Sequence, residues 1–462
     1  MTRRSDLHHY LDELVERHRL VGVGLAVLAD GEVHELASGR ADVRSPTPMT
    51  VDTLCLIGST TKLLTATLAL QLVDEGMLRL DDPVLRYLPG CRIPDGITVR
   101  QLLCHTSGLD VGAYSDHGRG ERSVARYVAT LGPDNVVAAP GEQWGYSNAG
   151  YVIAGRLVEV LRGTDWDEAL RRYLLEPAGL IHSATLPEHT LLHPVSVPHV
   201  RAGTEAEVCR AWGVAGRALG PTGSTLAMTA GDLVRFAELH LGGGIAGTGN
   251  RLLSEESVAA MQAPQVDVTP GSPFAQQWAL GWYAASWGDR VFRGHSGHNL
   301  GAGSHLALFP EMGGALALVF NTIPGDSALC HELFADLAGE LFGATKPDPW
   351  LPVTPLSAPD LAPLTGRYAC SQFRLDVAAN GGALKVVAVG ERELARPPTR
   401  MVPALFGRAW GSGQLGAHAA PPPDGFVTPE LFFSAADATG HPRYAHLSVF
   451  PSRRICDESE IR

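Results

Sequence analysis

Strand-like runs occur in this chain at two places that lie far apart in the sequence. Near the beginning, 21–28 and 33–38 are rich in valine and leucine, and Asp30-Gly31 between them favours a hairpin turn. The later runs are Trp278 to Tyr283, Val291 to Arg293, His305 to Phe309 and Ala315 to Asn321. Because helical patterns fill the region between the two groups, the sequence predicts one sheet that is assembled from both ends of a domain.

Helical patterns precede and separate these runs. Ser5 begins a segment with apolar residues at helical spacing, and 63–73 is an apolar helical stretch that Gly76 ends. From about 81 to 244, helical patterns alternate with loops rich in glycine, proline and serine. A last pattern, 332–341, predicts a helix that covers the sheet. We therefore expect an α/β domain with a helical subdomain.

A change in composition divides the chain. Prolines cluster between residues 343 and 364, at Pro347, Pro349, Pro352, Pro355, Pro359 and Pro363. This clustering predicts a semi-rigid linker over 344–364, after a first domain of 1–343. The remaining part, 365–462, contains four strand-like runs between glycine and proline turns, namely Tyr368 to Val377, Leu384 to Val389, Pro429 to Phe433 and Tyr444 to Phe450. It is predicted to be a small antiparallel β-domain.

The charge of the chain limits its partners. The 37 basic and 49 acidic residues give a formal net charge of −12, which argues against nucleic acid or an anionic membrane as a partner. No stretch reaches the ~20 apolar residues of a transmembrane helix, and 1–19 lacks the apolar segment of an export signal. The 7 cysteines are dispersed, as is typical of a reduced protein. These features predict a cytoplasmic location.

Ser59 and Lys62 form the first candidate catalytic pair. They are three positions apart at the start of the apolar helix, so the hydroxyl and the amine share one face. A serine needs a neighbouring base to become a nucleophile, and a buried lysine can be that base, whereas arginine does not release its proton. Lysine is rare here, since Lys346 and Lys385 are the other two in the sequence. The alternative is that Ser59 only caps the helix.

Two further motifs carry groups that suit acyl transfer. Tyr146-Ser147-Asn148 supplies a phenol that can relay protons and an amide that can hold the lysine or a substrate carbonyl. His295, in Gly294-His-Ser-Gly-His298, lies between two strand-like runs, where a polar side chain can hold the substrate. Each motif has a structural alternative, because a half-buried tyrosine in a turn and a lone histidine are both common.

Together these motifs resemble those of the serine β-lactamase and penicillin-binding-protein superfamily, specifically its class C β-lactamase-like branch. The resemblance covers about 5–343, and further matching segments are Gly76 to Pro89, Leu102 to Leu109, Gly223 to Phe236 and Leu280 to Trp282. It implies an antiparallel sheet flanked by helices and a helical subdomain. Because of the added β-domain, which would be a lipocalin-like barrel, the chain is similar to D-aminopeptidases and to standalone penicillin-binding-protein-type thioesterases, which release and cyclise nonribosomal peptides.

The resemblance also implies the role of each residue. Ser59 would be the nucleophile, with Lys62 and Tyr146 as general bases or acids. Asn148 would position the substrate, and His295 would occupy the third element, where β-lactamases have lysine. The backbone amides of Ser59 and His298 would form the oxyanion hole. A histidine is largely neutral at pH 7, which favours peptide, ester or amide substrates over β-lactams.

Neither a metal nor a cofactor is predicted. His182, His189, His193 and His199 are clustered in the sequence, but prolines interrupt any helix that could align them.

These features lead to a specific functional hypothesis. A peptidyl thioester, presented by a carrier protein, would acylate Ser59, and the peptide's own amine would then release it as a macrolactam. The β-domain would help to shape the pocket. The runner-up is a D-stereospecific peptidase or esterase that hydrolyses the same kind of intermediate, and a non-catalytic scaffold is a remote third.

Overall fold

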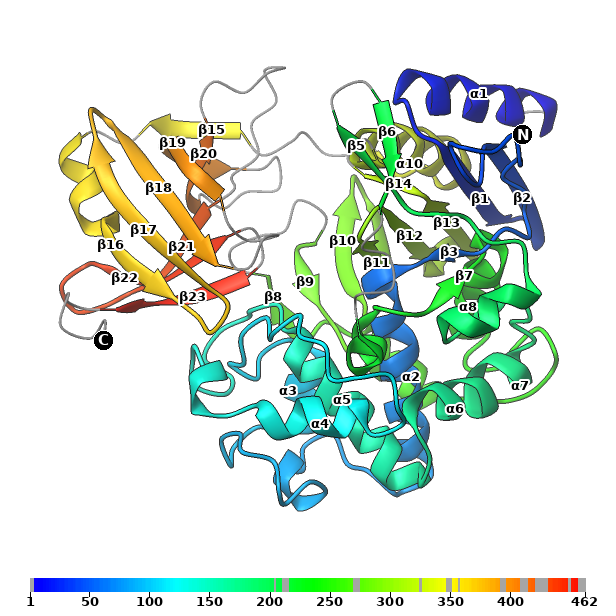
Figure 1. Ribbon diagram of the computed structural model, residues 1–462, viewed down its shortest axis with the longest axis horizontal. Coiled ribbons are helices and arrows are strands. Elements are labelled where there is room, and N and C mark those ends of the chain that lie inside the picture. Colours follow the sequence, from blue (N-terminus) through cyan, green and yellow to red (C-terminus); the bar gives the residue numbers. More distant parts are fainter. Residues whose placement is uncertain are drawn as a thin grey trace.

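The computed structural model describes residues 4–202, 205–209, 216–268, 275–323, 326–345, 351–355, 358–390, 396–407, 414–419, 431–447 and 450–455. A larger α/β part lies beside a smaller part made of strands (Figure 1). No helix in these segments is both long and apolar enough to span a bilayer.

An antiparallel sheet of eight strands forms the centre of the larger part, in the order β2-β1-β13-β12-β11-β10-β9-β8. Its strands are β1 (Gly22–Ala29), β2 (Glu32–Gly39), β8 (Val266–Asp267), β9 (Gln277–Trp278), β10 (Tyr283–Trp287), β11 (Arg290–Asn299), β12 (Ala302–Phe309) and β13 (Gly314–Phe320). Leu25 of β1 pairs with Leu36 on one side and Leu318 on the other. The prediction of one sheet built from both ends of the domain is confirmed.

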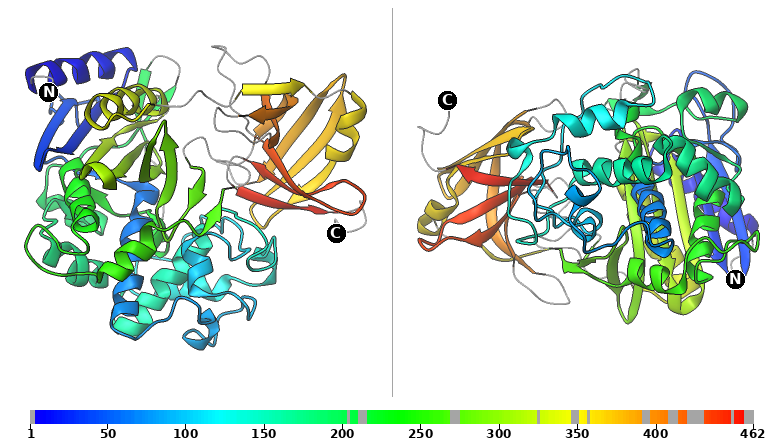
Figure 2. Two further views of the ribbon diagram at one scale, coloured as in Figure 1. Left: turned by 180° about the vertical axis from the view of Figure 1, so that it is seen from behind. Right: turned by 90° about the horizontal axis from the view of Figure 1, so that it is seen from below.

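Helices cover both faces of this sheet. The helices are α1 (Arg4–Arg17), α2 (Thr61–Asp74), α3 (Val99–Leu103), α4 (Ser123–Thr130), α5 (Asn148–Arg162), α6 (Trp166–Leu170), α7 (Glu176–Ala178), α8 (Ala230–Leu241), α9 (Glu255–Gln262) and α10 (Asp326–Phe342). Figures 1 and 2 show α1 and α10 together on one face, while α8 packs on the other. Every residue of β1, β12 and β13 is consequently buried.

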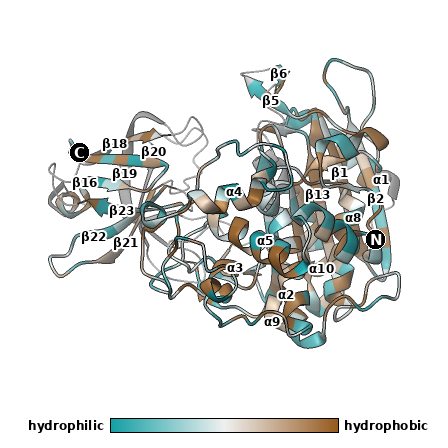
Figure 3. Ribbon diagram, turned by 60° about the horizontal axis from the view of Figure 1, so that its bottom comes forward, coloured by the Kyte–Doolittle hydropathy of each residue, from teal (hydrophilic) through white to brown (hydrophobic). Residues whose placement is uncertain are grey.

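The helical subdomain surrounds α2. This helix contacts α5, α6 and α9, and it is buried from Thr61 to Leu72. Figure 3 accordingly shows α2 as mostly hydrophobic. The described segments also form two three-stranded sheets, one of β3 (Cys55–Leu56), β4 (Ser183–Ala184) and β7 (Ala227–Met228), the other of β5 (His199–Ala202), β6 (Glu205–Val208) and β14 (Thr322–Ile323). In the first of these sheets, β3 directly precedes the turn that leads into α2.

The predicted strand from Trp278 to Tyr283 is wrong, because the chain turns between β9 and β10. The amide of Ala279 donates to the carbonyl of Trp282, and Gly281 has a φ of +95°. A Cβ atom on Gly281 would lie 3.1 Å from the Cβ of Ala66, on α2. Glycine therefore allows this turn to approach the buried helix closely.

The C-terminal strands form a barrel. They are β15 (Leu351–Pro355), β16 (Gly366–Ala369), β17 (Phe373–Asn380), β18 (Ala383–Gly390), β19 (Arg396–Gly407), β20 (Gln414–Ala419), β21 (Leu431–Ala436), β22 (Pro442–Leu447) and β23 (Phe450–Ile455). They form one antiparallel sheet, and the additional pairing of β19 with β20 closes eight of them into a ring, as expected for a lipocalin-like domain (Figure 1). Of the predicted run 429–433, residues 429–430 lie outside the described segments.

Three segments differ from the sequence prediction. The predicted linker, 344–364, contains β15, which pairs with β19, and its Leu361 and Leu364 are buried in the barrel core. Its residues 346–350 and 356–357 lie outside the described segments. The run from Tyr368 to Val377 is divided into β16 and β17, because residues 370–372 turn outward and Ser371 bonds to the larger part. The run from Tyr444 to Phe450 is likewise divided, because β22 and β23 pair antiparallel with Leu447 opposite Phe450; its residues 448–449 lie outside the described segments.

Candidate active site

Ser59 lies where the chain enters α2. It is in a short 3-10 turn, Gly58–Thr60, which β12 holds because the hydroxyl of Ser304 lies 2.8 Å from both the carbonyl oxygen of Ile57 and the hydroxyl of Thr60. Gly58 has a φ of +55°. Ser59 itself is partly exposed, so a substrate can reach its hydroxyl.

Lys62 faces Ser59 across one helical turn. Its Nζ lies 3.0 Å from Ser59 Oγ and donates a hydrogen bond of 2.9 Å to the carbonyl oxygen of Thr222. The side chain is completely buried, and this burial lowers the pKa of the amine well below its ordinary value. A neutral amine at this distance can accept the Ser59 proton.

Tyr146 completes a cluster of three with Ser59 and Lys62. Its ring centre lies 5.0 Å from Lys62 Nζ, and its phenol hydrogen-bonds to Ser59. Burial raises the pKa of the phenol well above its ordinary value, while the bond to Ser59 acts in the opposite direction. The phenol is therefore protonated at neutral pH, which suits it to donate a proton.

Asn148 is the first residue of α5 and is linked to Lys62 through Thr222. Its Oδ1 accepts a 3.1 Å hydrogen bond from the Thr222 hydroxyl, and its Nδ2 donates one of 3.1 Å to the Tyr114 hydroxyl. The carbonyl of the same Thr222 accepts from Lys62. The amide is thus fixed in orientation beside the cluster. Neither Thr222 nor Tyr114 was identified from the sequence.

His295, on β11, is buried among the rings of Trp278, Tyr283 and Tyr146. Its Nδ1 lies 2.7 Å from the carbonyl oxygen of Ser296, so this nitrogen carries the proton. Its Nε2 finds no hydrogen-bond partner in the part of the chain that the structure describes. Burial lowers the pKa of His295 to about 3. The third element is therefore neutral at pH 7.

The backbones of Ser59 and His298 approach each other where two glycines permit it. A Cβ atom on Gly58 would lie 2.5 Å from the His298 nitrogen, and one on Gly297 would lie 2.7 Å from the Ser59 nitrogen. The two amides predicted as an oxyanion hole therefore belong to segments in direct contact. Because only the backbone of His298 is needed, an exposed side chain there is compatible with this role.

His105 is a further residue of the site that the sequence did not identify. It has a φ of +61°, and its Nδ1 accepts a 3.1 Å hydrogen bond from the Ser147 amide. Its ring lies against that of Tyr146, with 4.3 Å between their centres. Burial lowers the pKa of the imidazole well below its ordinary value. His105 was part of a matching segment, but nothing in that segment indicated which residue faces the site.

Comparison with known proteins identifies the family. The family model described as Beta-lactamase matches residues 7–338. The chain belongs to this family. The prediction of the β-lactamase and penicillin-binding-protein superfamily is thereby confirmed, and with it the expectation of an enzyme that works through a serine acyl-enzyme.

Relatives of this β-lactamase-family chain match different shares of it. Penicillin-binding protein 4 from Amycolatopsis lactamdurans is 39% identical over 364 residues, which are 77% of this chain and 95% of the relative. The crystal structure of SurE is 30% identical with a TM-score of 0.79, covering 98% of this chain and 99% of SurE. A D-amino acid amidase from Ochrobactrum anthropi SV3, complexed with D-phenylalanine, is 27% identical with a TM-score of 0.57, covering 68% and 90%.

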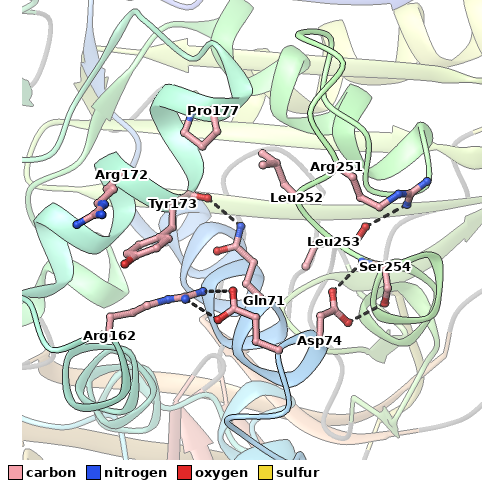
Figure 4. Close-up of a pocket in the computed structure, with 11 residues that line it drawn as sticks. Gln71, Asp74, Arg162, Arg172, Tyr173, Pro177, Arg251, Leu252, Leu253 and Ser254 are labelled. Atoms are coloured by element: carbon pink, nitrogen blue, oxygen red, sulfur yellow. Dashed lines mark hydrogen bonds and ion pairs between the residues drawn. The ribbon is translucent and has the colours of Figure 1, made fainter.

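A cavity of about 440 Å³ lies at the other end of α2, away from Ser59 (Figure 4). Polar side chains line it, but they bind one another. Arg162 forms an ion pair of 2.6 Å with Glu75, and Asp74 accepts hydrogen bonds of 2.7 Å from both the amide and the hydroxyl of Ser254. None of the serine, lysine and tyrosine cluster lines this cavity, so it is separate from the acyl site of the family.

Proposed function

We propose that this β-lactamase-family enzyme is a serine acyltransferase that cyclises peptides. It would accept a peptidyl thioester, form a peptidyl ester on Ser59, and release the peptide as a head-to-tail macrolactam. The observation that carries the proposal is the buried Lys62 amine, 3.0 Å from Ser59 Oγ and depressed in pKa. The other residues of the site determine whether the acyl-enzyme is released by cyclisation or by hydrolysis.

Acylation follows from the geometry. Neutral Lys62 takes the Ser59 proton as Oγ attacks the thioester carbonyl, and the amides of Ser59 and His298 receive the oxyanion. The C–S bond breaks and the Tyr146 phenol protonates the departing sulfur. The proton that Lys62 took from Ser59 then moves to Tyr146, so that both groups regain their starting protonation states.

Release requires the peptide's amine to compete with water. The amine attacks the Ser59 ester and forms an amide, one amine proton leaves through Tyr146 and Lys62, and Ser59 regains its hydrogen. Intramolecular attack has effective molarities of about 10⁵ M or more when the groups are well placed. The buried rings of Trp278 and Tyr283 border the site beside His295 and favour this outcome because they limit access of water.

The neutral third element supports a neutral acyl donor. A thioester has no carboxylate at the reacting carbon, so a histidine with a pKa of about 3 does not disfavour it. The likeness to SurE, also solved with D-Leu, and to a D-amino acid amidase supports a D-residue at the acylating position. A carrier protein that presents the thioester is the partner we propose.

The test uses a linear peptidyl thioester of a small thiol, with a D-residue at the reacting end. We expect mass spectrometry to show a product lighter than the linear acid by one water, and none with Ser59→Ala. The matched control is the same peptide with an acetylated N-terminus, which acylates the enzyme but cannot cyclise.

A D-stereospecific peptidase or esterase is the second candidate, favoured by the amidase likeness. If a series of free-amine thioesters yields linear acid alone, this candidate replaces the cyclase. A fluorescent fluorophosphonate separates both from a non-catalytic scaffold, because a folded protein that never labels at Ser59 has no activated nucleophile.

A further inference from the structure

The two parts of the molecule exchange side chains next to the catalytic cluster. Val111 belongs to the α/β part, yet its side chain is fully buried in the core of the barrel with Leu375 and Leu447. In the opposite direction, Phe450 of β23 packs against both cores, and its ring lies edge-on to Tyr146 with 6.1 Å between centres. Each part therefore lacks a piece of its own packing without the other.

Polar contacts support this exchange. The carboxylate of Asp110, itself buried, accepts hydrogen bonds from the amide and the hydroxyl of Ser371, in the turn between β16 and β17. Arg443 of β22 forms an ion pair of 2.5 Å with Glu142, a few residues before Tyr146. A buried carboxylate bonded to a backbone amide needs that partner, because leaving it unpaired costs free energy.

The exchanged residues connect directly to the catalytic segment. The carbonyl of Val111 accepts hydrogen bonds of 3.2 and 3.3 Å from the amides of Asn148 and Ala149, at the start of α5. The carbonyl of Asp110 accepts a 2.6 Å bond from the Ser147 hydroxyl. The barrel thus contacts Tyr146 directly through the Phe450 ring, and it reaches the three residues after Tyr146 indirectly, through Asp110 and Val111.

From this we propose that the barrel is a working part of the catalytic site, and that Phe450 is a positioning residue that holds the Tyr146 ring against Ser59 and Lys62. The aromatic edge fixes the ring and covers the cluster from water. This role concerns the activation of Ser59. The proposal therefore rests on the acyl-enzyme part of the proposed function, and it holds whether the acyl group is released by cyclisation or by hydrolysis.

Loss of the Phe450 ring should change the pH dependence of acylation at Ser59. The ionisable groups that face the Tyr146 ring or its hydroxyl in the described segments are Lys62 on α2, His105 after α3, Tyr114, Tyr151 on α5 and His295 on β11. Burial keeps the two histidines neutral and the phenols of Tyr146 and Tyr151 protonated, which leaves the lysine to set the pH dependence of acylation. Water admitted beside Tyr146 would favour charged Lys62.

The experiment measures the rate at which a fluorescent fluorophosphonate labels Ser59 between pH 5 and 9. In Phe450→Ala we expect the acidic limb to move to higher pH by about one unit, so that labelling at pH values on that limb falls on the order of tenfold. Phe450→Tyr, which keeps the ring, should restore the original profile. The matched control is Phe433→Ala. It removes a ring from the same barrel, but the Phe433 ring packs on Tyr368 and not on Tyr146.

Two results would overturn the proposal. One is an unchanged pH profile in Phe450→Ala, and the other is an equal shift in Phe433→Ala, which would mean that barrel stability alone is responsible. If near-UV circular dichroism shows Phe450→Ala to be unfolded, Phe450→Leu, which keeps most of the volume without the ring, is judged by the same criteria. Failure of the wild-type enzyme to label would instead contradict the proposed function.

Discussion

At the scale of single residues, the site depends on a lysine in a place that is unfavourable for its charge. Lys62 is fully buried beside Ser59, and burial is the cause of its depressed pKa. The carbonyl of Thr222 accepts from the amine but does not neutralise a positive charge. Folding therefore favours the neutral form, which is the form that can deprotonate the serine.

Lys62→Arg should abolish acylation although it keeps a long, hydrogen-bonding side chain. A guanidinium does not release its proton at neutral pH, so Ser59 would lose its base. We expect the rate of fluorophosphonate labelling to fall by roughly 10²- to 10⁴-fold. The matched control is Lys385→Arg, an exposed position on β18, which should label at the wild-type rate. Wild-type labelling of Lys62→Arg would exclude Lys62 as the base.

Lys62→Met should stabilise the protein while inactivating it. The folded state holds Lys62 with a pKa below that of the unfolded chain, so unfolding takes up a proton and wild-type stability rises with pH in the interval between the two pKa values. The gain from methionine should therefore shrink as pH increases, by up to about 1.4 kcal/mol per pH unit. Urea unfolding at pH 7, 8 and 9 measures this difference. A gain that is constant with pH would contradict it.

At the scale of elements, the site is made where the turn before α2 meets β11. Gly58 and Gly297 face each other's segments so closely that no side chain fits at either position. The turn presents Ser59 and the helix presents Lys62, while the strand presents His295 and the His298 amide, and the two glycines set the separation between them. A sequence pattern locates each element, but this separation arises only when the sheet has formed.

Gly58→Ala should impair catalysis far more than its strain alone explains. Its Cβ would lie 2.5 Å from the His298 nitrogen and would push β11 away from Ser59, with the loss of one oxyanion donor. We expect labelling to slow by about 10²- to 10³-fold. Gly76→Ala is the matched control, since Gly76 also has a left-handed φ, of +72°, but nothing lies within 4 Å of its added Cβ. Similar losses of labelling rate in both variants would show that backbone strain alone accounts for the effect of Gly58→Ala.

For the whole molecule, local patterns predicted the elements better than the contacts between them. Ser59, Lys62, Tyr146, Asn148 and His295 each lie in a recognisable motif, and the structure brings them together at one end of α2. Val111 and Phe450 look like ordinary apolar residues in the sequence, because their importance comes from pairing across a distance that no local pattern encodes. The proline-rich segment was predicted to be a linker for a similar reason, because β15 can be recognised only from its pairing with β19, which lies far away in the sequence.

The exchange of side chains between the two parts also predicts how they unfold. Val111→Ala removes apolar volume from the barrel core while its carbonyl still holds Asn148 and Ala149, and it should cost about 2 kcal/mol. We expect hydrogen exchange to increase both in β16–β18 and at the start of α5. Val386→Ala makes the same change in the same core, on β18, and should affect the barrel strands alone. Because Val111 is bonded to α5 and Val386 is not, an equal pattern in the two variants would show that the parts are not coupled through Val111.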